Sequence, residues 1–204
     1  MPREILVVKK EELFDGVEFQ GFCHLVLKDF MNIILEKFEY QERNQELENN
    51  PAFKQIIPYV WIVNPVSKKV FLYKRSTEGE EGRLHNKYSG GVGGHIDKDT
   101  EANSENPIID AMMRELREEV KLENYPIPKF IGFLNDDIDV VGQVHFGVVA
   151  IAETEEEAKP LMHMEHGKFY TIDEVEKLIS MKENELEGWS KFSWPFVKNY
   201  ISNL

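Results

Sequence analysis

The sequence predicts an α/β protein in which strands and helices alternate along the chain. Two observations indicate this class. Short runs rich in β-branched and aromatic residues lie between turn residues, as strands do, and longer stretches carry apolar residues at helical spacing. The expected strands cover residues 56–64, 70–76, 129–134, 143–152 and 168–172, and the expected helices cover residues 107–121, 173–181 and 193–201.

Composition narrows the class of protein further. The chain has 204 residues, of which 42% are hydrophobic and 30% are charged, so it is long enough for one globular domain with a sizeable core. No apolar run approaches the length of a membrane span, and the first residues do not resemble a signal peptide. Cys23 is the single cysteine, which excludes an intrachain disulfide and fits the reducing cytoplasm. We therefore expect a cytoplasmic protein.

The charge balance limits the expected partners. The formal net charge is −13, which disfavours long nucleic acids and anionic membranes, because both bind basic surfaces. A small anionic substrate remains compatible with this charge if metal ions supply local positive charge at the site.

Residues 1–50 carry no general motif, and we expect an N-terminal extension that packs on or flanks a main domain at residues 51–204. Within the extension, residues 4–8 are predicted to form a short edge strand. The polar stretch at residues 36–50 is predicted to be a linker or an exposed segment. The extension could line a pocket, form a homodimer contact, or do neither.

The main domain opens with a predicted hairpin, in which strands 56–64 and 70–76 flank a turn. Near the C-terminus, Thr171 and Glu174 are spaced as a capping box at the start of a helix. Ser193, Trp194 and Pro195 are expected to open the final amphipathic helix.

A central helix is predicted between two sets of prolines. Pro107 suits the first helical turn, with Asn106 or Ser104 as its cap, whereas Pro126 and Pro128 prevent continuation much beyond residue 121. Apolar residues on one face of this helix should turn toward the core. They are Ile109, Met112, Met113, Leu116 and Val120.

A second face of the same helix gathers negative charge. Glu115, Glu118 and Glu119 are spaced i, i+3 and i+4, so their carboxylates share one side of the helix. Like charges this close destabilise an isolated helix by about a few tenths of a kcal/mol per pair, so a positive partner is expected. A hard divalent cation such as Mg²⁺ prefers carboxylate oxygens and often bridges to substrate phosphates.

The run Arg114-Glu115-Leu116-Arg117-Glu118-Glu119, preceded by Gly93-Gly94, resembles the signature of the Nudix hydrolase superfamily. The R-E-U-x-E-E half, in which U is aliphatic, matches at every position. The first half departs from the signature, because the loop between Gly94 and Arg114 is about six residues longer. Glu101 or Glu105 could stand in for the missing glutamate. Lys121 replaces the late glycine, so Asn124 could cap the helix in a left-handed conformation, or the helix end could fray.

The resemblance implies a fold, a cofactor and site residues. The implied fold is a mixed β-sheet sandwiched between α-helices. The implied cofactor is Mg²⁺ or Mn²⁺, bound by Glu115, Glu118, Glu119 and the backbone carbonyl of Gly93. Arg114 would pair with a signature carboxylate and hold its orientation. Either Glu118 or Glu115 could instead take the proton from the attacking water, and the residues do not separate these roles.

Substrate contacts are expected elsewhere. Arg75 and Lys74 end a strand just upstream of the signature, where Nudix proteins often carry a basic residue, although a solvent-facing pair would look the same. Family members often add one more acid after the signature helix, and the candidates are Asp136, Asp137, Asp139 and Glu165. His145 could line the pocket or be a hydrogen-bonded structural histidine. His95 is expected to be structural.

The resulting hypothesis is a metal-dependent hydrolase of a nucleoside diphosphate linked to another group, or of a similar small organic pyrophosphate. One alternative is a ligand-binding or regulatory module that has kept the fold and lost the chemistry, which the degenerate half of the signature motivates. Isopentenyl diphosphate isomerase shares the fold, but it uses a catalytic cysteine in a motif that Cys23 lacks. Decapping of mRNA agrees poorly with the acidic charge.

Overall fold

The computed structural model describes residues 2–24, 28–76, 87–161, 164–181 and 186–204. The chain divides into two compact units, each built from three segments. Unit 1 comprises Met1–Tyr59, Gly93–Met112 and Phe130–Val149, and unit 2 comprises Val60–Val92, Met113–Lys129 and Ala150–Leu204.

Four elements contribute residues to both units: β4 (Phe53–Asn64), α4 (Pro107–Glu119), β9 (Lys129–Asn135), of which only Lys129 lies in unit 2, and β10 (His145–Glu153). Unit 1 also contains β1 (Glu4–Lys9), α1 (Lys10–Phe14), β2 (Gly21–His24), α2 (Phe30–Lys37), β3 (Glu39–Glu42), η1 (Leu47–Asn49), α3 (Lys98–Glu101) and η3 (Gly142–Val144). Unit 2 contains β5 (Lys69–Arg75), β6 (Tyr88–Ser89), β7 (Gly91–Val92), β8 (Val120–Lys121), β11 (Lys159–Pro160), β12 (Met164–Thr171), α5 (Ile172–Met181) and α6 (Gly188–Ser202).

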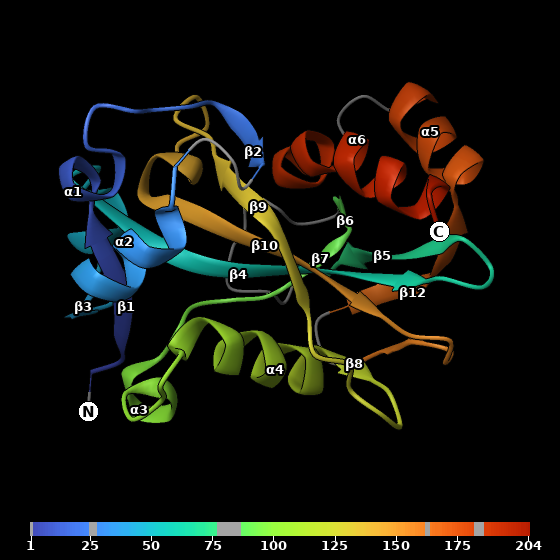
Figure 1. Ribbon diagram of the computed structural model, residues 1–204, viewed down its shortest axis with the longest axis horizontal. Coiled ribbons are helices and arrows are strands. Elements are labelled where there is room, and N and C mark those ends of the chain that lie inside the picture. Colours follow the sequence, from blue (N-terminus) through green and yellow to red (C-terminus); the bar gives the residue numbers. More distant parts are fainter. Residues whose placement is uncertain (1, 25–27, 77–86, 162–163, 182–185) are drawn as a thin grey trace. The chain divides into compact units, whose positions relative to one another are not determined.

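The strands of unit 1 follow the order β2-β9-β10-β4, with β1 paired to β4 and β3 paired to β1 (Figure 1). The prediction of an edge strand at residues 4–8 was wrong, because β1 has antiparallel neighbours on both sides, including Val7 opposite Gln55 and Glu39. Of the two alternatives for residues 36–50, the linker was wrong, since the stretch contains β3 and η1, whereas most of its residues are exposed or half-exposed, as the other alternative expected. The strand β3 was missed because its side chains are polar and half exposed, so they show no apolar alternation.

Aromatic residues fill the core of unit 1. Phe14 of α1, Phe30 of α2, Phe133 of β9 and Phe146 of β10 are almost fully buried. Their rings meet mostly edge to face, for example Phe30 and Phe133 with centroids 5.2 Å apart. Such pairs add about 0.5–1.5 kcal/mol beyond their area burial. Because these rings come from segments far apart in the chain, they anchor the first 40 residues to β9 and β10.

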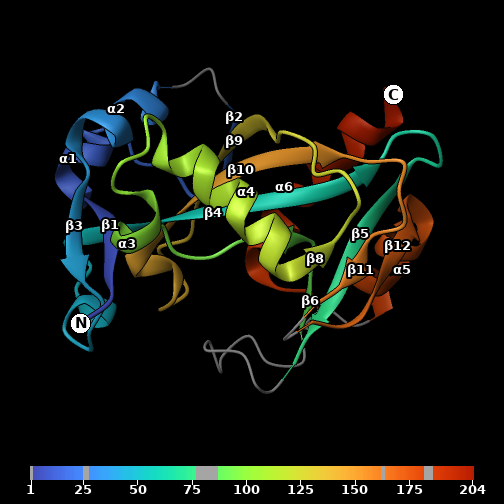
Figure 2. The same cartoon turned by 90° about the horizontal axis from the view of Figure 1, so that it is seen from below.

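In unit 2, the predicted hairpin is confirmed, since Val63 of β4 pairs with Val70 of β5. Strand β12 pairs with the other side of β5. The second half of α4 and helix α6 lie on opposite sides of these strands, as both ribbon views show (Figures 1 and 2). The predicted α/β class with a sheet between helices is therefore confirmed.

The central helix matches its predicted start and, at Met112, Leu116 and Val120, its predicted buried face, but not its predicted end. Asn106 is the cap, because its side chain accepts a hydrogen bond from the backbone N–H of Ile109. Ile109 itself is 40% exposed, and the fully buried Ile108 takes the place predicted for it. Asn124 does not cap the end in a left-handed conformation, since α4 passes directly into β8 after Glu119.

Three smaller differences concern element limits. Residues 97–106, predicted to be a loop, contain the short helix α3. Strand β10 begins at His145, two residues later than predicted, because η3 precedes it. The final helix begins at Gly188 instead of 193, with Pro195 inside it. The capping box is confirmed, since Thr171 and Glu174 exchange hydrogen bonds between side chain and backbone.

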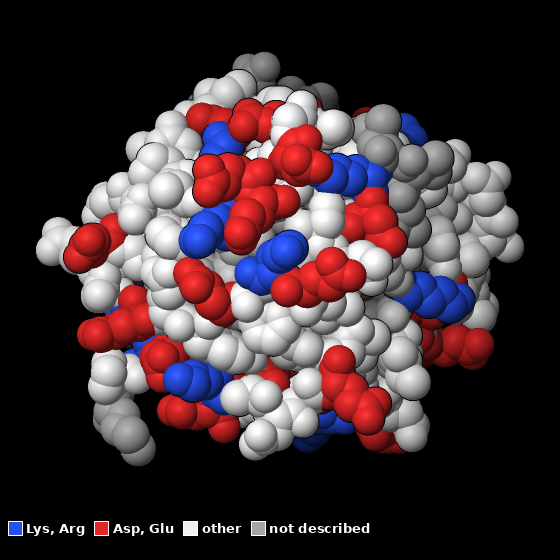
Figure 3. All heavy atoms as spheres, turned by 60° about the vertical axis from the view of Figure 1, so that its left-hand side comes forward, with Lys and Arg blue, Asp and Glu red and all other residues white. Residues whose placement is uncertain are grey.

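Charge on the surface follows the composition. Acidic side chains gather over much of the face shown in Figure 3, with basic side chains between them. Among the described residues, no helix is long and apolar enough to cross a membrane.

Candidate active site

The arginine of the signature run forms ion pairs with two of its glutamates. Arg114 Nη1 lies 2.7 Å from Glu115 Oε1 and 3.1 Å from Glu118 Oε2. Helical spacing explains the second contact, since residues four apart share a face. Glu115 is buried, whereas the side chain of Glu118 is 55% exposed. A buried carboxylate needs such a partner, because burying an isolated charge is costly. Arg114 is therefore the counter-charge of this acidic face.

Glu119 lies within electrostatic range of β5. Burial raises the pKa of Tyr73 strongly; the negative charges of Glu119 and Glu187 raise it further, and the positive charge of Arg75 opposes them. The phenol of Tyr73 is therefore neutral at physiological pH, and it donates a hydrogen bond to the carbonyl of Gly91 at 3.0 Å. Tyr73 is thus hydrogen-bonded to the glycine-rich segment, which we define as residues 89–95, and lies within electrostatic range of Glu119.

Arg75 is held by an acid that the sequence reasoning missed. Its Nη1 lies 3.8 Å from Glu187 Oε2 and 3.5 Å from the hydroxyl of Tyr73. Glu187 immediately precedes α6 and is buried. The sequence held one sign of a buried polar site near Glu187. Ser190 and Ser193 place hydroxyl groups at helical spacing next to Trp194. All three are buried in the structure.

Two glycines of the glycine-rich segment, Gly90 and Gly93, are needed for close packing. A Cβ on Gly90 would lie 2.1 Å from the indole of Trp61, in unit 2. A Cβ on Gly93 would lie 1.8 Å from the carbonyl oxygen of Pro58, in unit 1. Real Cβ atoms do not come this close to a backbone oxygen. A side chain at either position would therefore displace β4 or its tryptophan.

The donor set of α4 fits a hard divalent cation by chemistry. Carboxylate oxygens are the ligands that Mg²⁺ and Mn²⁺ prefer, and Glu115, Glu118 and Glu119 supply them within five residues. Among the residues that the structure describes, no three His, Cys, Asp or Glu side chains converge in a metal-binding arrangement. The guanidinium of Arg114 instead lies against Glu115 and Glu118.

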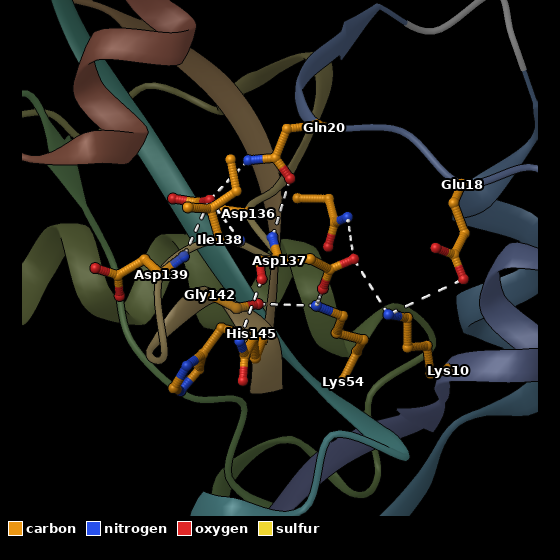
Figure 4. A network of polar contacts seen from close by, with 12 residues as sticks. Lys10, Glu18, Gln20, Lys54, Asp136, Asp137, Ile138, Asp139, Gly142 and His145 are labelled. Atoms are coloured by element: carbon orange, nitrogen blue, oxygen red, sulfur yellow. Dashed lines mark hydrogen bonds and ion pairs between the residues drawn. The ribbon is translucent and has the colours of Figure 1, made fainter.

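Asp137 lies in a different cluster, in unit 1. Lys54 Nζ donates to Asp137 Oδ1 and to the carbonyl of Gly142, both at 2.8 Å, and Lys10 Nζ donates to Asp137 Oδ2 at 3.1 Å (Figure 4). Burial raises the pKa of Asp137, but the hydrogen bonds from Lys54 and Asn135 outweigh burial and lower it overall. The carboxylate is therefore ionised and neutralised by two lysines.

The other three candidates for an additional acid after the signature helix have structural partners or lie at the surface. Asp136 accepts hydrogen bonds from Gln20 Nε2 and from the backbone N–H of Ile138. Asp139 accepts one from the backbone N–H of Val141. Glu165 is exposed on β12.

The two candidate histidines, His95 and His145, lie side by side in unit 1. Their rings are 5.5 Å apart, with His145 buried on β10. His145 Nδ1 donates to the carbonyl of Val141 at 2.6 Å, and His95 Nε2 lies 2.6 Å from Gln55 Oε1. Both rings are thus hydrogen-bonded to neighbouring groups of the fold.

The expanded loop places its two glutamates differently. Glu101 is buried and accepts a hydrogen bond from the backbone N–H of Asp97 at 2.7 Å, so it stabilises the start of α3. Glu105 is exposed. Arg75, Arg114 and the three signature glutamates all belong to unit 2, where Arg114 contacts Glu115 and Glu118. Gly93, Asp137 and His145 belong to unit 1.

Comparison with known proteins identifies the family. The NUDIX domain matches residues 55–200. Protein YmaB of Bacillus subtilis (strain 168) is 33% identical over 205 residues, which cover 94% of this chain and 96% of YmaB. The crystal structure of Tm1382, assigned provisionally to the Nudix hydrolases, shares 30% identity with a TM-score of 0.78, covering 97% of this chain and 99% of that one.

A more distant fold neighbour is the bifunctional NMN adenylyltransferase/ADP-ribose pyrophosphatase from Francisella tularensis, solved with AMP and a Mn ion. It is 10% identical, with a TM-score of 0.52, over 72% of this chain and 42% of that one. The family match covers well over half of the chain. This chain therefore belongs to the NUDIX family, and it is an enzyme of the Nudix pyrophosphohydrolase type.

Proposed function

We propose that this enzyme hydrolyses a nucleoside diphosphate linked to another group, or a similar small organic pyrophosphate, with Mg²⁺ or Mn²⁺ as cofactor. One observation supports this most: three carboxylates share one face of α4, and Arg114 contacts two of them, Glu115 and Glu118. Like charges destabilise a helix, so a stretch that retains them needs a cation for its function.

The cofactor would be held by Glu115, Glu118 and Glu119. The family resemblance, and no distance in this structure, assigns the carbonyl of Gly93 to the same ion. A bound divalent cation supplies positive charge for the pyrophosphate and lowers the pKa of a bound water. Arg114 would keep Glu115 and Glu118 oriented through the two contacts described above. Either Glu118 or Glu115 would accept the proton of the attacking water, and exposed Glu118 is the more accessible of the two.

Charge and fold neighbours support a small nucleotide-type substrate. A net charge of −13 disfavours long nucleic acids and anionic membranes as partners. The neighbour from Francisella tularensis contains AMP and a Mn ion. Arg75 is the proposed phosphate contact, with Asp137 and His145 as further candidates in unit 1. We also propose a cytoplasmic location, since Cys23 is a buried free thiol, and a homodimer remains a proposal.

The central test removes the proposed metal ligands without changing side-chain volume. The double variant Glu118→Gln/Glu119→Gln should lose about 10³-fold in turnover, because activation of water by the metal contributes several kcal/mol. Turnover would be measured with Mg²⁺ or Mn²⁺ on ADP-ribose, a dinucleoside polyphosphate and a dNTP. Undiminished turnover in the double variant would refute the assignment.

A matched control and a binding assay complete this test. Glu155→Gln/Glu157→Gln removes two charges from the acidic loop after β10 and should leave turnover unchanged. The ligand-binding module is the alternative, motivated by the degenerate first half of the signature. Calorimetry of the wild-type protein with Mg²⁺ and the same three compounds distinguishes the two, because binding without product over hours favours the module.

A further inference from the structure

Glu187 is a buried acid that the proposed reaction leaves without a role. It lies just before α6, with a side chain that is 4% exposed. Its carboxylate accepts hydrogen bonds from Ser89 Oγ at 2.7 Å and from Ser190 Oγ at 3.3 Å, and it lies 3.8 Å from Arg75 Nη1. These partners come from β6, α6 and β5, so one carboxylate joins three elements of unit 2.

The same end of α6 holds the backbone of the glycine-rich segment. Ser190 Oγ accepts a hydrogen bond from the N–H of Gly90 at 2.9 Å. The N–H of Glu187 donates to the carbonyl of Tyr88 at 3.0 Å. Ser89 Oγ lies 3.1 Å from the carbonyl of Gly91. Two residues later in the chain comes Gly93, the proposed backbone ligand of the metal.

A structural role alone does not need a charged group here. Neutral acceptors such as asparagine or glutamine would satisfy the two serine hydroxyls, at a lower cost of removing the group from water. In the part of the chain that the structure describes, the charge of Glu187 lies 3.8 Å from the guanidinium of Arg75. That arginine also reaches the hydroxyl of Tyr73, which lies within electrostatic range of Glu119. Contacts therefore lead from Glu187 through Arg75 and Tyr73 toward the signature helix.

We propose that Glu187 is a positioning residue for pyrophosphate hydrolysis. It orients the guanidinium of Arg75 toward a substrate phosphate, and with Ser190 it fixes the turn formed by Ser89, Gly90 and Gly91. This inference rests on the proposed function, because a phosphate-bearing substrate gives the orientation of Arg75 its purpose.

Glu187→Gln separates the charge from the shape of the side chain. The amide oxygen still accepts from the serines, whereas the ion pair with Arg75 is lost. We expect the KM for ADP-ribose, or for whichever panel compound the wild type hydrolyses, to rise about tenfold, as for other groups that orient a ligand-binding residue. The kcat should change by less than about threefold, because Arg75 would bind ground state and transition state alike. Glu187→Asp, which keeps the charge, should recover part of the loss.

Backbone hydrogen exchange tests the second half of the proposal without activity. Ser190→Ala removes the acceptor for the Gly90 N–H, so the amides of Gly90 and Gly91 should exchange faster. Glu187→Gln should leave that exchange nearly unchanged. Glu176→Gln is the matched control, since Glu176 accepts bonds from Trp194 and Lys198 of α6 at 2.8 and 2.9 Å, away from the turn. It should change neither the KM nor the exchange.

The outcomes separate this proposal from the proposed function. A wild-type protein that hydrolyses no compound of the panel refutes the proposed function. If the wild type is active and Glu187→Gln keeps the wild-type KM, only the positioning role is overturned. A KM raised equally by Glu187→Gln and by the control Glu176→Gln also overturns it, because general loosening of α6 would then explain the change. Should Glu187→Gln fail to fold, Glu187→Asp carries the same comparison.

Discussion

Two charged clusters of the molecule differ in how their charges are balanced. In unit 1, the carboxylate of Asp137 meets two lysines, Lys10 and Lys54, and the second is fully buried (Figure 4). In unit 2, a single guanidinium, that of Arg114, meets both Glu115 and Glu118. A carboxylate that meets two lysines has little attraction left for a further cation, whereas two carboxylates that share one guanidinium can attract one. Charge balance thus distinguishes the proposed metal ligands from Asp137, which is proposed only as a substrate contact.

The largest effect is expected from a change in the cluster of Asp137, Lys10 and Lys54, here called the balanced cluster. Lys54→Met should lower the free energy of unfolding by about 3–5 kcal/mol, because it leaves the carbonyl of Gly142 and one oxygen of Asp137 without their buried donor. Urea denaturation followed by circular dichroism measures this change.

A double-mutant cycle sharpens this result. Adding Asp137→Asn to Lys54→Met should cost less than the sum of the two single changes, since the partners then no longer leave each other unpaired. Strict additivity would contradict the view that Lys54 and Asp137 stabilise the loop as a pair.

The second effect concerns the acidic cluster. Arg114→Gln should lower kcat/KM about 10–100-fold, because Glu115 and Glu118 lose the group that orients them. Arg117→Gln, an exposed arginine on the same helix, is the control and should stay within about twofold of the wild type. Steady-state kinetics on the active compound of the panel would measure both. Equal losses of kcat/KM in the two variants would show that the charge of the helix, and not the orientation of Glu115 and Glu118, causes the loss.

A pH series tests the balanced cluster from another side. The hydrogen bonds of Lys54 and Asn135 lower the pKa of Asp137 overall. Its contribution to the free energy of unfolding is therefore fully present above the ordinary pKa of an aspartate, about 3.9, and is lost as the pH falls through the lowered value. The stability gap between wild type and Asp137→Asn should be wide at neutral pH and close in acid. A gap that stayed constant between neutral pH and pH of about 3 would exclude this linkage.

The smallest effect is expected in the acidic cluster without metal. Glu119→Gln removes repulsion from Glu115, four residues earlier, so the free energy of unfolding should stay within about 0.5 kcal/mol of the wild type or rise slightly. The measurement is thermal unfolding in chelator-containing buffer. A loss of more than about 1 kcal/mol would show that Glu119 is itself structural.

Local patterns predicted much of this fold and its signature helix. The hairpin at β4 and β5, the proline-led start of α4 and the capping box at Thr171 each depend on a few neighbouring residues, so the sequence contains what is needed. The order of Glu115, Glu118 and Glu119 on one helical face follows from spacing alone. These features therefore do not depend on tertiary contacts.

Long-range contacts account for what the sequence reasoning missed. Strand β3 is polar along its length, and its pairing with β1 decides its conformation. The burial of Ile108 in place of Ile109 depends on where the sheet lies against α4. Glu187 lies 112 positions beyond Arg75 in the chain, and no local rule connects them. The donors to the Asp137 carboxylate likewise come from three distant elements, α1, β4 and β9.

The interleaved course of the chain has a consequence for protein engineering. Each unit consists of three separate stretches, and β4, α4, β9 and β10 supply residues to both. Neither unit can therefore be excised and expressed by truncation, and a reporter or a new terminus must enter where no such element is cut. The tight turn between β4 and β5, with Val66 73% exposed at its tip, is the natural insertion point.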